Sequence, residues 1–382
     1  MKGISTQLLH TGYAPNKLTG DIIPPIHIST TFKFGNEGSY DYSRSGNPTR
    51  AILEATLAAL DGMKYGLAFS SGSAVLATVV ASLRQGEEIL FSTDAYGGTY
   101  RYIVNVAGKQ NVPYHIVDLT DPKKVDEVLK KNSIKYIWLE TPSNPLMKVA
   151  DIGILAKLAH RHGAFLIVDN TFASPVVQQP ALHGADIVVY STTKYMNGHS
   201  DVVGGALLTS TEELYTKLKF LQNAIGAILS PFDSWLTLRG LRTLELRMER
   251  HVQNATHIAQ YLSTDKRIKK VFYPGLATGD AKRIVKKQMK NGGGMLSIEI
   301  DPKYDAKGFL NALHYFPLAE SLGGVESLID HPASMTHASI PKEEREKIGL
   351  TDGLLRISVG IENGDDLIAD LKQAIEKMGK GT

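Results

Sequence analysis

The chain has 382 residues, of which 43% are apolar and 21% are charged. These proportions are typical of globular proteins and exclude a disordered chain, while the length favours a large domain with a smaller companion. The net charge of +3 comes from scattered basic residues, so nothing indicates a nucleic-acid-binding surface. The sequence contains no cysteine, which excludes disulfides, thiolate metal sites and a catalytic thiol.

Residues 1–46 are expected to form an extended arm. They show no sustained periodicity and include Pro24, Pro25, Gly35 and Gly38, so the arm is expected to pack on another surface.

The first ten residues lack a basic segment followed by an apolar stretch, and no apolar run approaches the roughly 20 residues that span a bilayer. We therefore expect a cytoplasmic protein without membrane contact.

Residues 47–240 are expected to form the larger domain. Asn47 and Pro48 are suited to begin a helix and Gly62 to end it, which predicts a helix from Thr49 to Asp61. Short apolar runs then alternate with helical stretches, and this rhythm predicts a mainly parallel sheet covered by helices. The runs are Leu67 to Phe69, Glu88 to Phe91, Tyr136 to Leu139, Phe165 to Val168, Ile187 to Tyr190 and Gly205 to Leu208.

Residues 241–382 are expected to form the smaller domain. A long polar helix from Ser234 to Ser263 is predicted to lead into it. Strands are predicted near Met295 to Ile300 and Leu355 to Val359, followed by a final helix from Asp365 to Met378.

Polar residues follow five of the predicted strands at the point where each strand ends. In an open α/β sheet the ligand crevice lies outside the carboxyl ends of the strands. These loops, although distant in sequence, are therefore expected to face one shared site. They are Ser70 to Ser73, Thr93 to Tyr96, Glu140 to Asn144, Asp169 to Thr171 and Ser191 to Lys194.

Two of these loops are suited to bind a phosphate. The backbone amides of residues 71–73, between a strand and an apolar helical stretch, could point at an anion from a helix N-terminus. The alternative is an ordinary strand-to-helix turn. The hydroxyls of Ser191 and Thr193, at the end of another strand, are suitable further donors and favour the phosphate.

Asp169 and Lys194 each suggest a functional group, against a simpler alternative. Asp169 ends the most apolar strand, where an unpaired carboxylate is costly, so it needs a cationic partner unless it is a structural cap. Lys194 stands close behind a buried strand, where burial would lower the pKa of its amine and make it a nucleophile. The alternative for Lys194 is a solvated surface lysine.

Six segments of the chain carry a familiar order of residues. They are Tyr42 to Arg50, Ala95 to Thr99, Glu140 to Pro145, Val168 to Thr171, Ser191 to Tyr195 and Ala319 to Gly324. Together they resemble the cystathionine γ-lyase and γ-synthase family of pyridoxal-phosphate enzymes over nearly the whole chain. The resemblance implies an α/β protein of fold type I, with a mainly parallel seven-stranded sheet in the large domain and a smaller α/β C-terminal domain. It further implies pyridoxal 5'-phosphate as cofactor, a small amino-acid substrate, no metal, and a homotetramer built from dimers that share active sites.

The resemblance also implies roles for individual residues. Lys194 would carry the cofactor as an internal aldimine, Asp169 would pair with its ring nitrogen, and Tyr96 would stack on the ring. Further cofactor contacts would come from Gly72, Ser73, Thr171, Ser191 and Thr193, joined by Tyr42 and Arg44 of a neighbouring subunit.

Arg356 lies in an apolar run, where a buried guanidinium needs an acceptor. By resemblance that acceptor is the α-carboxylate of the substrate; the alternative is an internal salt bridge. The residues implied to support substrate, cofactor or Arg356 are Asn144, Glu320, Ser321 and Thr336.

The implied reaction is γ-elimination of L-cystathionine to L-cysteine, 2-oxobutanoate and ammonia, with Lys194 as general base and Tyr96 assisting proton transfer. Cystathionine γ-synthase and β-lyase activities remain alternatives because these enzymes share the same groups. By resemblance, Glu320 is the residue that γ-lyases and γ-synthases place near the distal end of the substrate, where its carboxylate could attract a distal ammonium. The alternative is a glutamate on a helix surface. Gly98 stands where methionine γ-lyases resemble one another in having a cysteine, which argues against that activity. Asp41 stands where γ-lyases commonly have a glutamate, and in this it is closer to the synthases.

Two further alternatives come from outside this enzyme class. The segment Gly198 to Asp201 superficially suggests a serine hydrolase, but Val202 stands where that motif needs its second glycine. A non-catalytic cofactor-binding protein is the other alternative, and the presence of Lys194, Asp169, Tyr96 and Arg356 together argues against it.

Overall fold

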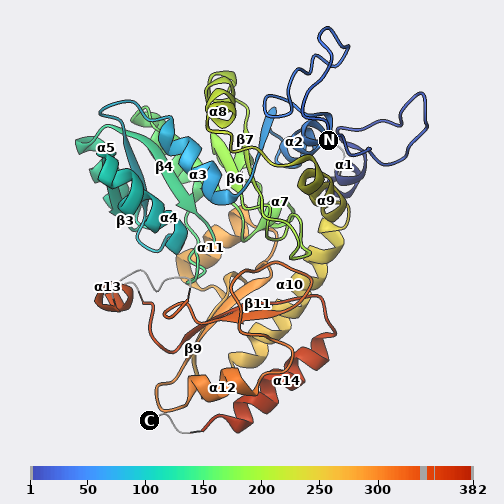
Figure 1. The fold of residues 1–382 in the computed structure, drawn as a ribbon. Coiled ribbons are helices and arrows are strands. Elements are labelled where there is room, and N and C mark those ends of the chain that lie inside the picture. Colours follow the sequence, from blue (N-terminus) through green and yellow to red (C-terminus); the bar gives the residue numbers. More distant parts are fainter. Residues whose placement is uncertain (1–2, 336–341, 348, 380–382) are drawn as a thin grey trace.

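The computed structural model describes residues 3–335, 342–347 and 349–379. Figure 1 shows a helix-covered sheet in the upper part of the molecule and a smaller helix-covered sheet in the lower part. The long helix α10 (Leu244–Leu262) runs along both. Arm residues before α2 (Pro48–Leu60) project as loops beside the upper part.

The upper sheet has seven strands in the order β1-β7-β6-β5-β4-β2-β3. All its pairs are parallel except those of β7, which runs antiparallel to both β1 and β6. The prediction of a mainly parallel seven-stranded sheet is confirmed. The strands are β1 Tyr65–Phe69, β2 Glu88–Ser92, β3 Tyr114–Val117, β4 Ile134–Glu140, β5 Phe165–Asp169, β6 Ile187–Tyr190 and β7 Gly205–Thr209. The apolar runs do not reveal β3, because none of its four residues is fully buried.

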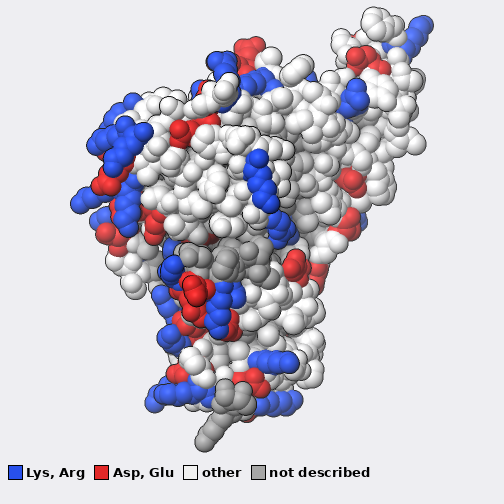
Figure 2. All heavy atoms as spheres, turned by 60° about the vertical axis from the view of Figure 1, so that its left-hand side comes forward, with Lys and Arg blue, Asp and Glu red and all other residues white. Residues whose placement is uncertain are grey.

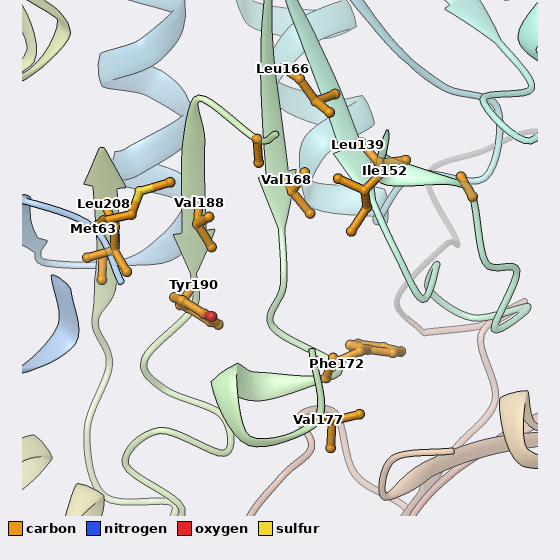
Figure 3. Packing of buried hydrophobic residues seen from close by; sticks show 14 of the residues in the cluster. Met63, Leu139, Ile152, Leu166, Val168, Phe172, Val177, Val188, Tyr190 and Leu208 are labelled. Carbon is orange, nitrogen blue, oxygen red and sulfur yellow. The ribbon is translucent and has the colours of Figure 1, made fainter. Parts of the chain in front are cut away.

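Both faces of this sheet are buried, which explains the continuous apolar runs. Alternate residues of one strand enter opposite layers, as Leu166 and Val168 do on one side of β5 and Ile167 on the other. Figure 3 shows Leu166, Val168 and Val188 among the side chains that pack together in the first layer. The covering helices are α2, α3 Gly72–Ala81, α4 Gly97–Tyr102, α5 Pro122–Lys131, α6 Ile152–Arg161, α7 Ser174–Val177, α8 Glu212–Ile225 and α9 Pro231–Leu241. Short turns of other helical types lie at Ile103–Ala107, Gly108–Gln110 and Pro180–His183.

Helix α2 begins as the sequence predicts. The side chain of Asn47 accepts hydrogen bonds from the backbone amides of Thr49 and Arg50, and Pro48 occupies the first turn. The arm differs from the prediction, because Ile4–His10 form a short helix, α1, that buries Leu8 in the upper core. The expectation of a fully extended arm is therefore wrong for these residues.

The predicted single helix from Ser234 to Ser263 is also wrong, because it is divided into α9 and α10. The guanidinium of Arg247, in α10, donates to the carbonyl of Gly240 at 2.8 Å and to the hydroxyl of Thr243 at 3.1 Å. The carbonyl of Gly240, at the end of α9, also accepts from the backbone amide of Thr243 at 3.3 Å, so Arg247 adds a further donor at this helix end. The same guanidinium donates to the carbonyl of Tyr195 at 2.8 Å, so the break lies against the loop that follows β6.

The lower sheet has four antiparallel strands in the order β10-β11-β9-β8. The predicted strands correspond to β9 and β11, whereas β8 and β10 were not predicted. The strands are β8 Ile268–Phe272, β9 Met295–Ile300, β10 Leu328–Asp330 and β11 Leu354–Ser358, and a short turn lies at Pro274–Leu276. The remaining helices are α11 Gly279–Gln288, α12 Ala306–Ala312, α13 Lys342–Lys347 and α14 Gly364–Lys377, the last close to its predicted range.

We propose that the chain divides into an arm (1–46), a larger domain (47–240) and a smaller domain (241–382). One cluster of buried apolar residues lies wholly within the proposed smaller domain and supports the division. The larger cluster belongs mainly to the larger domain but also takes in Val285, Met289, Met295 and Leu322. Helix α10 bridges them, since Leu244 and Met248 belong to the upper cluster and Ile258 and Leu262 to the lower one.

The outer surface is mixed in charge. On the face in Figure 2, basic and acidic side chains alternate around wide uncharged areas. No helix among the described residues is long and apolar enough to cross a membrane.

Candidate active site

Loops from both sheets border one cavity of about 350 Å³. The carboxyl ends of β1, β2, β4, β5 and β6 contribute one wall, as expected for strands that run in the same direction. The segment before β10 and the middle of β11 contribute the opposite wall. The predicted site residues that line this cavity are Gly72, Ser73, Tyr96, Asn144, Asp169, Thr171, Ser191, Thr193, Lys194, Glu320, Ser321 and Arg356.

The amine of Lys194 lies between the two walls. Its Nζ donates a hydrogen bond of 2.8 Å to Oγ of Ser321. Burial, helped by the nearby charge of Arg356, lowers the pKa of Lys194 to about 8, although Glu320 and Asp330 oppose this effect. A larger fraction of this amine is therefore neutral near pH 7 than for a surface lysine, and only the neutral form is a base or nucleophile.

Two carboxylates lie next to each other at the bottom of the cavity. Glu140 ends β4 and Asp169 ends β5, and the parallel register places them opposite each other. The carboxylate of Glu140 accepts from the backbone amide of Tyr96 and from the hydroxyl of Thr99, both at 2.7 Å. Burial raises the pKa of both carboxyls, and the charge of Asp169 adds to the effect on Glu140. This part of the cavity is therefore suited to a cationic group of a ligand.

The N-terminus of α3 is suited to an anion. Oγ of Ser71 accepts from the amide of Ala74 at 3.0 Å, whereas the amides of Gly72 and Ser73 have no acceptor within the described part of the chain. A side chain at Gly72 would bring its Cβ to 3.2 Å from Cβ of Ser191, so glycine allows the close approach of these two loops. The approach places Ser191 beside the helix terminus.

Two threonines in the cavity wall hold the strand-end loops together. Oγ1 of Thr171 accepts from the amide of Ser191 at 2.8 Å. The hydroxyl of Thr193 accepts from the amide of Gly204 at 3.0 Å and donates to its carbonyl at 3.2 Å. These bonds fix the loops after β5 and β6 relative to each other and to β7.

Arg356 approaches the cavity from the middle of β11, where its side chain is only 3% exposed. Its guanidinium donates to Oδ1 of Asn144 at 2.9 Å and to the carbonyl of Ser321 at 3.1 Å. It also forms an ion pair with Asp330 in β10. The internal salt bridge raised as an alternative is therefore present, and Arg356 lines the cavity as well.

Two of the predicted site residues do not line this cavity. Tyr42 and Arg44 are exposed on the arm, where Nε of Arg44 donates to Oδ1 of Asn223 at 3.2 Å. Thr336 lies outside the described residues. The hydrolase-like segment is also elsewhere, since Ser200 is exposed and donates to Glu326.

No individual role is predicted from the sequence for two acidic residues: Glu140, whose loop is expected to face the site, and Asp330, which pairs with Arg356. Glu140 could have been found, because a carboxylate directly after a strongly apolar strand requires partners. Asp330 gives no comparable signal, since it lies in a strand of three residues. No group of three or more acidic or histidine side chains that could hold a metal ion occurs in the described ranges.

A sheet-edge cavity that combines a buried amine, a helix N-terminus with free amides and a buried guanidinium is typical of α/β enzymes that bind a phosphorylated cofactor and a substrate with a carboxylate. The sequence identifies the family, matching the one described as Cys/Met metabolism PLP-dependent enzyme over residues 5–376. The chain belongs to this family.

Several relatives are similar over their whole length. A cystathionine beta-lyase of Lactococcus lactis subsp. cremoris is 50% identical, covering 99% of this chain and 100% of the relative. A cystathionine gamma-lyase of Dictyostelium discoideum is 49% identical over 98% of both chains. Among solved structures, a cystathionine gamma-lyase of Lactobacillus plantarum complexed with L-serine has a TM-score of 0.95, with 43% identity and full coverage of both chains. A cystathionine gamma synthase of Xanthomonas oryzae pv. oryzae has the same TM-score and identity, covering 99% of this chain and 98% of that one.

The cavity fits pyridoxal 5'-phosphate, the cofactor of this family. The amides of Gly72 and Ser73 and the hydroxyl of Ser191 are the donors that a phosphate requires. Asp169 would offer the ring nitrogen of the cofactor a buried carboxylate, which ionises more readily beside a cation. Lys194 would offer the cofactor aldehyde an amine with a lowered pKa.

Proposed function

We propose that this protein catalyses pyridoxal-phosphate-dependent γ-elimination of L-cystathionine, which yields L-cysteine, 2-oxobutanoate and ammonia. The observation that carries this proposal is the meeting of Lys194, Asp169 and Arg356 in one cavity from three distant segments. When bound, the cofactor supplies an electron sink that stabilises negative charge at Cα of the substrate.

In this proposal the residues of the chain bind the substrate and move its protons. Arg356 binds the α-carboxylate of the substrate. Its hydrogen bonds to Asn144 and Ser321 hold the guanidinium in place, and its remaining N–H groups donate to the carboxylate. Lys194 removes the proton from Cα of the substrate and then one from Cβ. The electron pair left at Cβ forms the Cβ–Cγ double bond as the Cγ–S bond breaks. Tyr96, which lines the cavity, would pack beside the cofactor ring. Its hydroxyl is protonated near neutral pH and would protonate the departing sulfur.

Glu320 supports the choice of γ-elimination. Its carboxylate lines the cavity next to Ser321 and is close enough to raise the pKa of Lys194. An acidic group at this place attracts the distal ammonium of cystathionine and orients the bond to Cγ.

A second candidate is β-elimination of cystathionine to homocysteine, pyruvate and ammonia. It is favoured by the name of the Lactococcus relative, which is similar to this chain over its full length. Both reactions begin with removal of a Cα proton, from the homocysteine half of cystathionine in γ-elimination and from the cysteine half in β-elimination. The groups described so far therefore serve whichever half binds in the site. A third candidate is γ-replacement on an activated homoserine ester, because the similar Xanthomonas structure is that of a cystathionine gamma synthase.

The decisive experiment is product analysis with purified holoenzyme and L-cystathionine. We expect 2-oxobutanoate and cysteine in equal amounts. Pyruvate with homocysteine, and no 2-oxobutanoate, would replace our proposal with the β-lyase. Incubation of an activated homoserine ester with cysteine tests the third candidate, since net formation of cystathionine would indicate a γ-synthase.

We further propose a cytoplasmic homotetramer, built from dimers in which Tyr42 and Arg44 reach the phosphate of a neighbouring subunit. Two observations support shared sites. Both side chains are exposed and neither lines the cavity of its own chain. The arm also exposes Leu18 (93%) and Phe34 (92%), apolar side chains that a second copy of the chain would cover.

A further inference from the structure

Asp330 and Arg356 form a buried pair that the register of the small sheet specifies. They occupy opposing positions in the antiparallel pair β10–β11, so both side chains lie on the same face of the sheet. The exposed fractions of the two side chains are 1% for Asp330 and 3% for Arg356, and the pair is joined through Oδ2 and Nη2. A buried pair of this kind is costly to form, so its presence beside a cavity calls for an explanation.

The other partners of Arg356 are neutral. Asn144 offers an amide oxygen from the loop after β4, and Ser321 offers a backbone carbonyl. Both loops belong to the cavity wall, whereas Asp330 is not among the residues that line the cavity. Asp330 therefore holds the guanidinium from behind, on the side away from the space that a substrate would occupy.

We propose that Asp330 is a positioning residue, which fixes the guanidinium of Arg356 in the orientation that presents its donors to the carboxylate of an amino acid. This inference rests on the proposed function, because it takes the α-carboxylate as the ligand of Arg356. Arg356 and Asp330 also act in opposite directions on the amine of Lys194, so the pair moderates the positive charge near that amine.

The test compares two ligands that differ only in the carboxylate, L-alanine and ethylamine. Their affinities for the holoenzyme are measured by calorimetry in the wild-type protein, in Asp330→Ala and in Asp330→Asn. The asparagine keeps an oxygen that can accept from Nη2, whereas the alanine removes it. Glu299→Ala is the matched control, because Glu299 is a nearly buried acid in the same sheet that pairs with Lys269 away from the cavity.

The preference is the affinity for L-alanine divided by the affinity for ethylamine. We expect this ratio to be at least about tenfold lower in Asp330→Ala than in the wild-type enzyme, which corresponds to the loss of one charge-assisted hydrogen bond. Binding of ethylamine should stay within about twofold, and Asp330→Asn and Glu299→Ala should keep most of the preference. In steady-state kinetics, Asp330→Ala should raise KM for cystathionine more than it lowers kcat.

Three results would overturn the inference: an unchanged preference in Asp330→Ala, an equal loss for both ligands, or an equal loss of preference in Asp330→Asn. If the wild-type enzyme itself shows no preference for L-alanine, the assignment of Arg356 to the carboxylate fails and the role of Asp330 fails with it. Retained cofactor absorbance and an unchanged thermal transition establish that each variant is folded. Asp330→Ser is the substitute truncation if Asp330→Ala does not fold.

Discussion

The two walls of the cavity are built on different principles. The upper wall consists of loops at the carboxyl ends of parallel strands, and each of its functional groups follows an apolar run in the sequence. The lower wall takes its guanidinium from the middle of an antiparallel strand, and the counter-ion comes from the neighbouring strand. In the upper wall, groups meet because parallel strands end at one edge. In the lower wall they meet because register pairs two specific residues, which is not visible along the chain.

Among substitutions in the two walls, we expect the largest loss of activity from a change in the upper wall. Replacing Lys194 with alanine should lower kcat/KM for cystathionine at least about 10³-fold, since it removes the only proposed base for the Cα proton. Product formation by the purified variant checks this prediction. Lys286→Ala, an exposed position on α11, is the control and should retain full activity. A Lys194 variant that turned over normally would contradict the proposed chemistry.

A smaller effect is expected from the lower wall. Arg356→Lys keeps the charge but loses the planar fork that bonds Asn144 and Ser321 together with a carboxylate. We expect KM for cystathionine to rise about 100-fold, equivalent to about 2–3 kcal/mol, with a weaker effect on kcat. Arg267→Lys disturbs a local ion pair with Asp265 at the edge of the same sheet and should change KM little. An effect of Arg356→Lys on kcat alone would argue against substrate binding by the lower wall.

The smallest effect is electrostatic and links the two walls. In protein freed of cofactor, the labelling of Lys194 by trace acetic anhydride should rise with pH through about 8, because only the neutral amine reacts. Exposed lysines in the same digest should instead follow a pKa near about 10.4. Since the charge of Arg356 lowers the pKa of Lys194, Arg356→Gln should move this midpoint to higher pH. A Lys194 that titrates with the exposed lysines would contradict the buried environment of the amine.

Where the sequence was insufficient, the missing information was always a contact between distant segments. The half-buried strand β3 and the short strand β10 have too little apolar pattern to be recognised alone. The break between α9 and α10 depends on Arg247 reaching carbonyls of both Gly240 and Tyr195. Helix α1 forms in the arm where Leu8 finds the upper core. Secondary-structure propensity depends on neighbouring residues only, so it gives no information about these contacts.

By itself the sequence determined the helix-covered sheet and the strand-end loops that carry Asp169, Lys194 and residues 72 and 73, because strand periodicity and strand-end chemistry are local properties. Tertiary structure decided which carboxylates accompany these groups. Glu140 gains its role by lying beside Asp169, and Asp330 by opposing Arg356 across two strands. A buried charge is stabilised by whatever lies within a few ångströms of it, and only folding brings those partners from distant parts of the chain.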